Sequence, residues 1–208
     1  MMSKKILAID LDGVIIDSLR NMRIAWGNTS KKYSLNISFN TYKKYLGLPF
    51  VEVLKKNGIY ENHKKIIKNF NSISVKNFKV IKVYKKMINT LNILKKKYMI
   101  IIITSKNKSR AKKILKLKKI PYDDLVTPDD VFRGKPYKDS ILYIKKKYLV
   151  KNTDIVYVGD FIVDYKFAKN SKIKFIFAKW GYGKQIGKFA VNHPIGLVRM
   201  VNHLLKYN

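Results

Sequence analysis

The chain has 208 residues, of which 45 are lysine or arginine and 13 are aspartate or glutamate, so its formal net charge at pH 7 is +32. It contains no cysteine, which excludes a disulfide scaffold. Its longest purely apolar stretch, Met99 to Ile103, is far shorter than a membrane-spanning helix. We therefore expect a cytoplasmic protein with no membrane partner.

The positive charge allows two interpretations. A strongly basic chain often binds nucleic acid or another polyanion. However, only five of the 45 basic residues are arginine, the residue that base recognition and bidentate phosphate binding favour. Lysine is spread along the whole chain and accompanies many isoleucines and asparagines, the residues that A/T-rich codons supply. We interpret the charge as compositional drift and predict no specific nucleic-acid partner, although weak, salt-sensitive binding is expected.

Short β-branched runs without polar alternation recur along the chain, and such runs are typical of parallel strands buried on both faces. Strands are predicted at residues 5–9, 99–103, 154–158 and 174–178, with a further short strand between the acidic pairs at 123–124 and 129–130. Helical patterns between them cover residues 84–97, 109–117, 138–148 and 195–205. The alternation predicts the α/β class, with a Rossmann-like parallel sheet as the core.

The region that follows the first strand interrupts this alternation. It contains no convincing strand, and its helical segments are predicted at residues 19–33, 41–46, 50–57 and 61–70. Glycine and proline punctuate these segments at Gly47-Leu48-Pro49 and near Gly58. We expect a helical domain over residues 18–79, inserted into a core domain formed by residues 1–17 and 80–208.

Two carboxylates follow the first predicted strand. In an open parallel sheet, ligands bind at the carboxyl ends of the strands, where Asp10 and Asp12 stand. Side chains two positions apart on an extended segment share a face, so both carboxylates would point into one site and repel each other. A divalent cation, or protonation of one partner, would offset that repulsion.

Other strand and loop ends supply complementary groups. Thr104 and Ser105 end the run IIITS and offer hydroxyls and a backbone N–H to an anion. Lys135 lies in the turn RGKP. Asp160 directly follows a strand, and Asp164 is one helical turn further along if a helix begins there.

The segments AIDLDGVIIDS, IIITSKN, RGKP and VGDFIVD resemble, in this order, the four motifs of the haloacid dehalogenase-like (HAD) hydrolase superfamily. The helical insert resembles a C1 cap. KWGYGK at 179–184 resembles the segment after a core strand in phosphoglycolate-phosphatase-like members. The resemblance covers essentially the whole chain and implies a HAD-type phosphomonoesterase, a phosphoric monoester hydrolase, with a HAD fold and an α-helical cap.

The resemblance also implies roles for these residues. Asp10 would attack phosphorus and form an aspartyl-phosphate intermediate. Asp12 would protonate the leaving alcohol and later deprotonate the water, while its backbone carbonyl would help to hold the metal. Thr104 and Ser105 would hold the phosphoryl oxygens, and Lys135 would neutralise the charge developing on them.

The implied cofactor is Mg²⁺, which Asp10 and Asp160 would bind, while Asp164 would orient Lys135 or a metal-bound water. In related caps a substrate-specificity loop lies where this chain has Gly47, Leu48 and Pro49, although a plain turn between helices explains these residues equally well.

The resemblance leaves several alternatives open. An acid at Asp12 favours phosphate esters over haloacids, and the substrate would be a small phosphorylated molecule: a phosphoglycolate-like acid, a sugar phosphate or a phosphorylated glycan precursor. A phosphomutase of the β-phosphoglucomutase type would share all four motifs. A non-catalytic protein that binds polyanions or nucleic acid is the alternative from another class, and arginine scarcity argues against it. We expect a monomer or homodimer.

Overall fold

The computed structural model describes residues 5–206, and side chains as far as residue 205, so the predicted core's outermost residues, 1–4 and 207–208, lie outside the described part. Its centre is a six-stranded sheet in the order β5-β4-β1-β6-β7-β8, in which every neighbouring pair is parallel. The strands are β1 (Ile6–Ile9), β4 (Met99–Ile103), β5 (Asp124–Val126), β6 (Ile155–Gly159), β7 (Lys174–Ala178) and β8 (Phe189–Val191). The predicted α/β fold class is confirmed.

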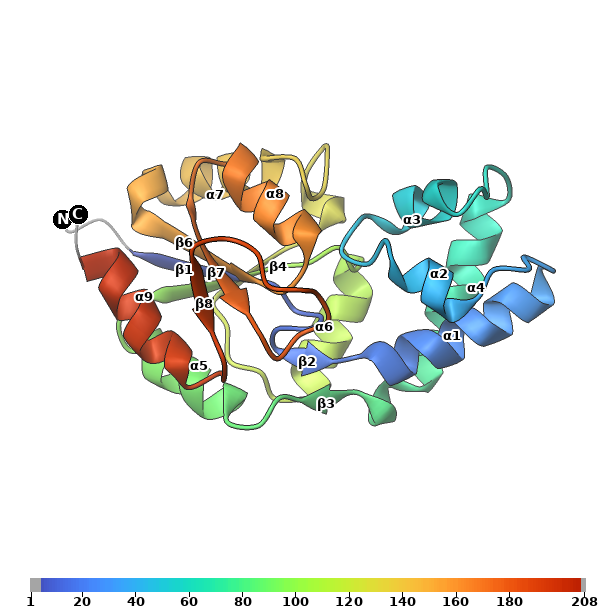
Figure 1. Cartoon of the computed structure of the whole chain (residues 1–208), viewed down its shortest axis with the longest axis horizontal. Helices are drawn as coiled ribbons and strands as arrows, with labels where there is room; N and C mark the ends of the chain where they lie inside the picture. The colour runs from blue at the N-terminus through green and yellow to red at the C-terminus, as the bar shows by residue number, and fades with distance from the viewer. Residues whose placement is uncertain (1–4, 207–208) are drawn as a thin grey trace.

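Helices cover both faces of the sheet (Figure 1). One face packs against α5 (Met87–Lys95), α6 (Lys108–Leu117) and α9 (Gly196–Lys206), and the other against α7 (Asp139–Tyr148) and α8 (Ile162–Asn170). Three short 3-10 helices lie in the connections: η1 (Phe78–Val80), η2 (Pro128–Asp130) and η3 (Asn152–Asp154). The result is a three-layer arrangement that buries the central strands on both sides.

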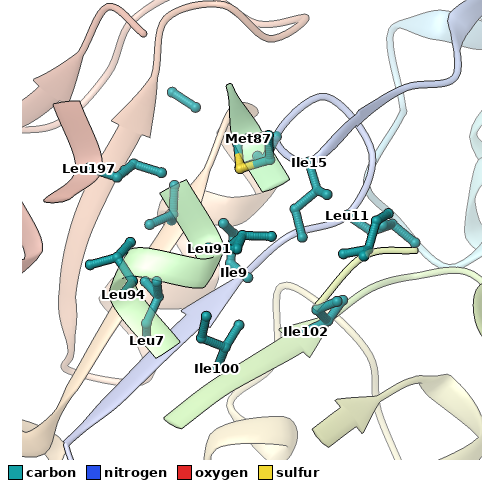
Figure 2. Packing of buried hydrophobic residues seen from close by; sticks show 14 of the residues in the cluster. Leu7, Ile9, Leu11, Ile15, Met87, Leu91, Leu94, Ile100, Ile102 and Leu197 are labelled. Atoms are coloured by element: carbon teal, nitrogen blue, oxygen red, sulfur yellow. The ribbon is translucent and has the colours of Figure 1, made fainter. Parts of the chain in front are cut away.

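The alternation of side chains along β1 explains why its sequence is continuously apolar. Leu7 and Ile9 point to the face where α5 packs, and Met87 and Leu91 of that helix meet them (Figure 2). Ile6 and Ala8 point to the opposite face and join the cluster that includes residues of α7 and α8. Both sets are fully buried, so no position of the strand favours a polar side chain.

A second group of helices lies beyond the carboxyl ends of the strands (Figure 1). These helices, here called the helical unit, are α1 (Leu19–Lys32), α2 (Phe39–Lys43), α3 (Phe50–Lys56) and α4 (His63–Lys76). The helical unit has an apolar cluster of its own, in which the rings of Trp26 and Tyr42 stack with centroids 4.4 Å apart. The helical unit therefore has a core of its own, and some of its residues line a pocket at the sheet edge.

Three strands were not predicted from the sequence. β2 (Ile16–Asp17) and β3 (Lys82–Val83) form an antiparallel ribbon where the chain enters and leaves the helical unit, and β8 closes the edge of the main sheet. A two-residue strand carries no periodicity, and its partner lies more than sixty residues away, so the sequence has no local signal for it.

The packing of the helical unit can be tested with Leu54→Ala. Leu54 is fully buried in its cluster, so truncation should leave a cavity and lower the free energy of unfolding by about 2–4 kcal/mol. Urea unfolding followed by circular dichroism measures the loss. Leu142→Ala, at a position that is 48% exposed on α7, is the matched control and should cost less than about 0.5 kcal/mol. Equal losses would contradict the described packing.

Candidate active site

The predicted site residues converge on one pocket between the carboxyl edge of the sheet and the helical unit. The pocket encloses about 70 Å³. Because β4, β1 and β6 are neighbours in the sheet, the loops that follow them meet although they lie far apart in the sequence. The lining includes Asp10, Asp12, Thr104, Ser105, Lys135, Asp160 and Asp164 from the core, and Gly47 and Leu48 from the helical unit.

Lys135 lies at the centre of the charged half of the pocket. Its ammonium group donates to Asp10 Oδ1 at 2.8 Å and to Asp164 Oδ1 at 2.7 Å, and it is 3% exposed. Burial alone would lower its pKa, but the two carboxylates outweigh burial and raise the pKa of Lys135 above its ordinary value. Lys135 therefore stays positively charged beside Asp10.

Asp164 orients its neighbours through both of its oxygens. Oδ1 accepts hydrogen bonds from Lys135 and, at 2.8 Å, from the hydroxyl of Tyr157. Oδ2 accepts from the backbone N–H groups of Asp160 and Phe161 at 3.2 and 3.1 Å, at the beginning of α8. Because both oxygens already have donors, Asp164 is better suited to positioning these groups than to binding a metal.

The carboxylates of Asp10, Asp160 and Asp164 bring oxygens within 4.8 Å of one another. Burial, followed by the neighbouring like charges, raises the pKa of Asp160 well above its ordinary value. Burial also raises the pKa of Asp10 to about 7, against the lowering effect of Lys135. Two buried carboxylates with raised pKa values indicate a place where a cation would be stabilising.

A divalent metal fits this donor set. Within residues 5–206, no hydrogen bond reaches Asp10 Oδ2 or Asp160 Oδ1, so one oxygen of each carboxylate lacks a donor. Oxygen ligands of this kind suit Mg²⁺. The geometry is compatible with the predicted metal ligands Asp10 and Asp160. Asp164 would position the groups around them and would not itself bind the metal.

Two glycines make room for Asp160. Its Oδ2 accepts a hydrogen bond from the backbone N–H of Tyr182 at 2.6 Å, which brings the loop after β7 against the site. Gly13 has a φ of +83°, and a Cβ there would lie 2.2 Å from Asp160 Oδ2. A Cβ at Gly181 would lie equally close to Asp160 Cβ. The segment KWGYGK is therefore part of the site's framework.

Asp12 has a lysine partner of its own that sequence reasoning missed. Lys106 donates to both carboxylate oxygens of Asp12 at 2.6 Å, and the Ser18 hydroxyl donates to Oδ1. Ser18 is held in turn by the Tyr182 hydroxyl, which accepts its backbone N–H at 2.8 Å. Lys106 directly follows the predicted pair Thr104 and Ser105, but in a lysine-rich chain its identity gave no signal.

The predicted phosphate-binding residues lie at the end of β4. Thr104 Oγ1 accepts the backbone N–H of Lys106 at 3.2 Å. The Ser105 hydroxyl donates to the backbone carbonyl of Gly47 at 2.5 Å and so joins the sheet edge to the helical unit. Among the hydrogen bonds of the described residues, none uses the backbone N–H of Ser105, which leaves that group available to an anion.

The turn at Gly47-Leu48-Pro49 contributes unequally to the pocket. Gly47 has a φ of +88°, and a Cβ there would lie 2.3 Å from Val163 Cγ1, so this position requires glycine. Gly47 and Leu48 line the pocket, whereas Pro49 is outside its lining and precedes the first residue of α3.

Comparison with known proteins is consistent with this geometry. The family model of haloacid dehalogenase-like hydrolases matches residues 7–178. A phosphoglycolate phosphatase of Aquifex aeolicus is 27% identical over 98% of this chain and 100% of its own. Two solved structures, a hydrolase from Pseudomonas syringae and a predicted phosphoglycolate phosphatase from Haemophilus somnus, both superimpose with a TM-score of 0.84. The Pseudomonas structure is 21% identical and its match covers 96% of this chain, and the Haemophilus structure is 19% identical and its match covers 97% of this chain. Each match spans 99% of the solved structure's own chain.

The family match covers most of the chain, and the protein therefore belongs to the haloacid dehalogenase-like hydrolases. Within that class it is an enzyme of the phosphomonoesterase kind, like its phosphoglycolate phosphatase relative. Both predictions from the four motifs, the family and the enzyme class, are confirmed.

Asp10→Asn should stabilise the metal-free protein. The folded state raises the pKa of Asp10 to about 7, so ionised Asp10 increasingly destabilises the fold as pH rises from about 4 to 7. A neutral side chain avoids this cost, and we expect a gain of about 1–3 kcal/mol at pH 8 and a smaller gain at pH 5. Thermal unfolding in EDTA at both pH values measures it. A lower melting temperature for the variant at pH 8 would refute the argument.

Proposed function

We propose that this protein is a Mg²⁺-dependent phosphatase that hydrolyses a small phosphomonoester through an aspartyl-phosphate intermediate on Asp10. The observation that carries the proposal is the environment of Asp10. Its Oδ1 is held by Lys135, its Oδ2 accepts no hydrogen bond from residues 5–206, and Asp12 and Asp160 line the same pocket. One nucleophile, one proton carrier and one cation site would therefore share a single pocket.

Asp10 begins the reaction in this scheme. Its Oδ2 attacks phosphorus, the bond from phosphorus to the ester oxygen breaks, and Asp12 donates a proton to the departing oxygen. A water molecule then attacks the aspartyl-phosphate, Asp12 accepts its proton, and the bond between phosphorus and Asp10 breaks to release inorganic phosphate. Mg²⁺, held by Asp10 and Asp160, would neutralise negative charge on the nucleophile and the phosphoryl group.

Fixed donors stabilise the phosphoryl oxygens. Lys135 stays charged and is held by Asp164 and Tyr157, so it needs little reorganisation when negative charge develops. The Thr104 hydroxyl and the backbone N–H of Ser105 lie at the end of the neighbouring strand. Lys106 and Ser18 fix the carboxylate of Asp12 in the same way.

The helical unit would act as the cap of this active site. In the proposed division, residues 18–79 form the cap, and residues 1–17 and 80–208 form the core. The separate apolar cluster of the helical unit supports this division, and the Ser105–Gly47 hydrogen bond joins the two parts beside the pocket. The cap would open to admit substrate and close to exclude bulk water from the aspartyl-phosphate step.

The protein's location and partners are predicted from its sequence. Within residues 5–206, none of the helices combines the length and hydropathy that a membrane crossing requires. A cytoplasmic location, a monomeric or homodimeric state and the lack of a specific nucleic-acid partner stay predictions from the sequence. A steep salt dependence of nucleic-acid binding that survives Asp10→Asn would instead favour a polyanion-binding role.

The proposed function predicts phosphate release that needs both metal and Asp10. Wild-type protein with Mg²⁺ should release phosphate from at least one member of a panel of phosphoglycolate, sugar phosphates and phosphorylated amino alcohols. EDTA or Asp10→Asn should abolish release, because each removes a group that the attack on phosphorus requires. Release that persists in Asp10→Asn would overturn the mechanism. Conversion of a sugar phosphate with little phosphate release would identify a mutase instead.

The role of Asp12 predicts a dependence on the leaving group. Asp12→Asn should lower kcat for alkyl phosphates by about 10²–10⁴-fold, because their leaving oxygen needs a proton. It should lower aspartyl-phosphate formation from p-nitrophenyl phosphate much less, since nitrophenolate leaves without protonation. Rapid-quench measurement of the first turnover separates this step from hydrolysis of the intermediate. Equal losses with both substrates would assign Asp12 a purely structural role.

A further inference from the structure

Arg110 of α6 is a buried cation in the pocket that the proposed mechanism does not use. It is 7% exposed and lines the pocket beside Lys106. Its Nη1 donates to Asn71 Oδ1 at 2.8 Å and its Nη2 to Ser74 Oγ at 2.7 Å, both on α4 of the helical unit. Its Nε is buried and has no hydrogen-bond acceptor among the described residues.

The charge of Arg110 is not balanced by an ion pair. No carboxylate within residues 5–206 lies within 4 Å of its guanidinium group, and its two hydrogen-bond partners are neutral. Asp12 acts on Arg110 electrostatically, but both Asp12 oxygens are already held by Lys106. Two buried cations therefore share one carboxylate, although buried charges in proteins are ordinarily paired.

The surroundings of Arg110 make an anionic partner more favourable. Its guanidinium carbon lies 5.5 Å from the centroid of the Phe70 ring. The helical unit's part of the lining is almost wholly apolar and consists of Met22, Tyr42, Leu46, Gly47, Leu48, Phe50, Val53 and Phe70. Such surroundings strengthen an ion pair with a ligand.

The same lining disfavours a sugar. Among the lining residues of the helical unit, only Tyr42 offers a polar side-chain group, its hydroxyl. The several hydroxyls of a sugar phosphate would lose water and find few partners there, which costs free energy for each unpaired group. A short carbon chain that ends in an anion would fit both the apolar wall and Arg110.

We propose that Arg110 binds a second anionic group of the substrate, a carboxylate or a second phosphate, and thereby selects small phosphorylated acids over neutral phosphate esters. The inference rests on the proposed function and deepens it by naming the substrate class. The unpartnered Nε and the two Nη atoms that donate to α4 of the helical unit also allow one residue to couple substrate binding to the position of the cap.

The test compares phosphoglycolate with ethyl phosphate, which has a methyl group in place of the carboxylate. Wild-type kcat/KM should favour phosphoglycolate by roughly tenfold or more, mainly through KM, since bonds to charged groups are the strong ones. Arg110→Gln should remove most of this preference, and Arg110→Lys should keep part of it. A short diol bisphosphate distinguishes a second phosphate from a carboxylate, according to which of the two is preferred.

Ser74→Ala is the matched control. It removes one contact of Arg110 with the helical unit but leaves the guanidinium group in place, so it should affect both substrates alike. The inference would be overturned if wild type preferred neither phosphoglycolate nor the diol bisphosphate over ethyl phosphate. A preference that survives in Arg110→Gln would overturn it as well. Losses in Arg110→Gln that are equal for phosphoglycolate and ethyl phosphate would show that Arg110 only holds the cap.

A binding measurement separates this inference from the proposed function. Calorimetric titration of Mg²⁺-loaded Asp10→Asn protein with phosphoglycolate and with ethyl phosphate needs no turnover. Tighter binding of phosphoglycolate that is lost when Arg110→Gln is added would support the inference, even if wild type hydrolysed neither compound and the proposed function failed. Equal affinity for the two ligands would overturn the inference, even if phosphatase activity were present.

Discussion

The arrangement of the active site depends most on the buried ion-pair network of Lys135 with Asp10 and Asp164. An isolated carboxylate at this depth would be expensive, and the ammonium group between the two reduces that cost. Asp164 can hold Lys135 because its other oxygen is fixed by the backbone N–H groups of Asp160 and Phe161, directly before α8. The start of one helix, the end of β6 and the turn that carries Lys135 are thereby tied to Asp10.

The two halves of the pocket have different physical characters. The sheet edge supplies nearly all of the charge, with Asp10 beside Lys135 and Asp12 beside Lys106. The helical unit supplies apolar side chains, and Arg110 reaches across from the core to join it. The charged half suits a phosphoryl group and a cation, whereas the apolar half would exclude water and leave a single cation for the rest of the substrate.

The sequence predicted the parts of the fold that local patterns encode. The buried strands were recognisable because both faces of β1 and β4 are apolar, and Asp10, Thr104 and Asp160 were recognisable because each directly follows such a strand. The fold class and the family followed from these features. The β2–β3 ribbon could not be predicted, because its two short strands pair across the whole helical unit and have no pattern of their own.

The sequence by itself determined which carboxylates and hydroxyls stand at the strand ends, because strand and turn patterns are local. Lys135, which meets Asp10 across 125 positions, was recognisable only through the resemblance of RGKP to a family motif. Lys106 meets Asp12 across 94 positions, and in a chain so rich in lysine neither its position nor its residue type singled it out, so only the tertiary structure identified it. Folding buries Lys106 and Lys135 beside carboxylates with which they form ion pairs. It buries Arg110 without an ion-pair partner among the described residues.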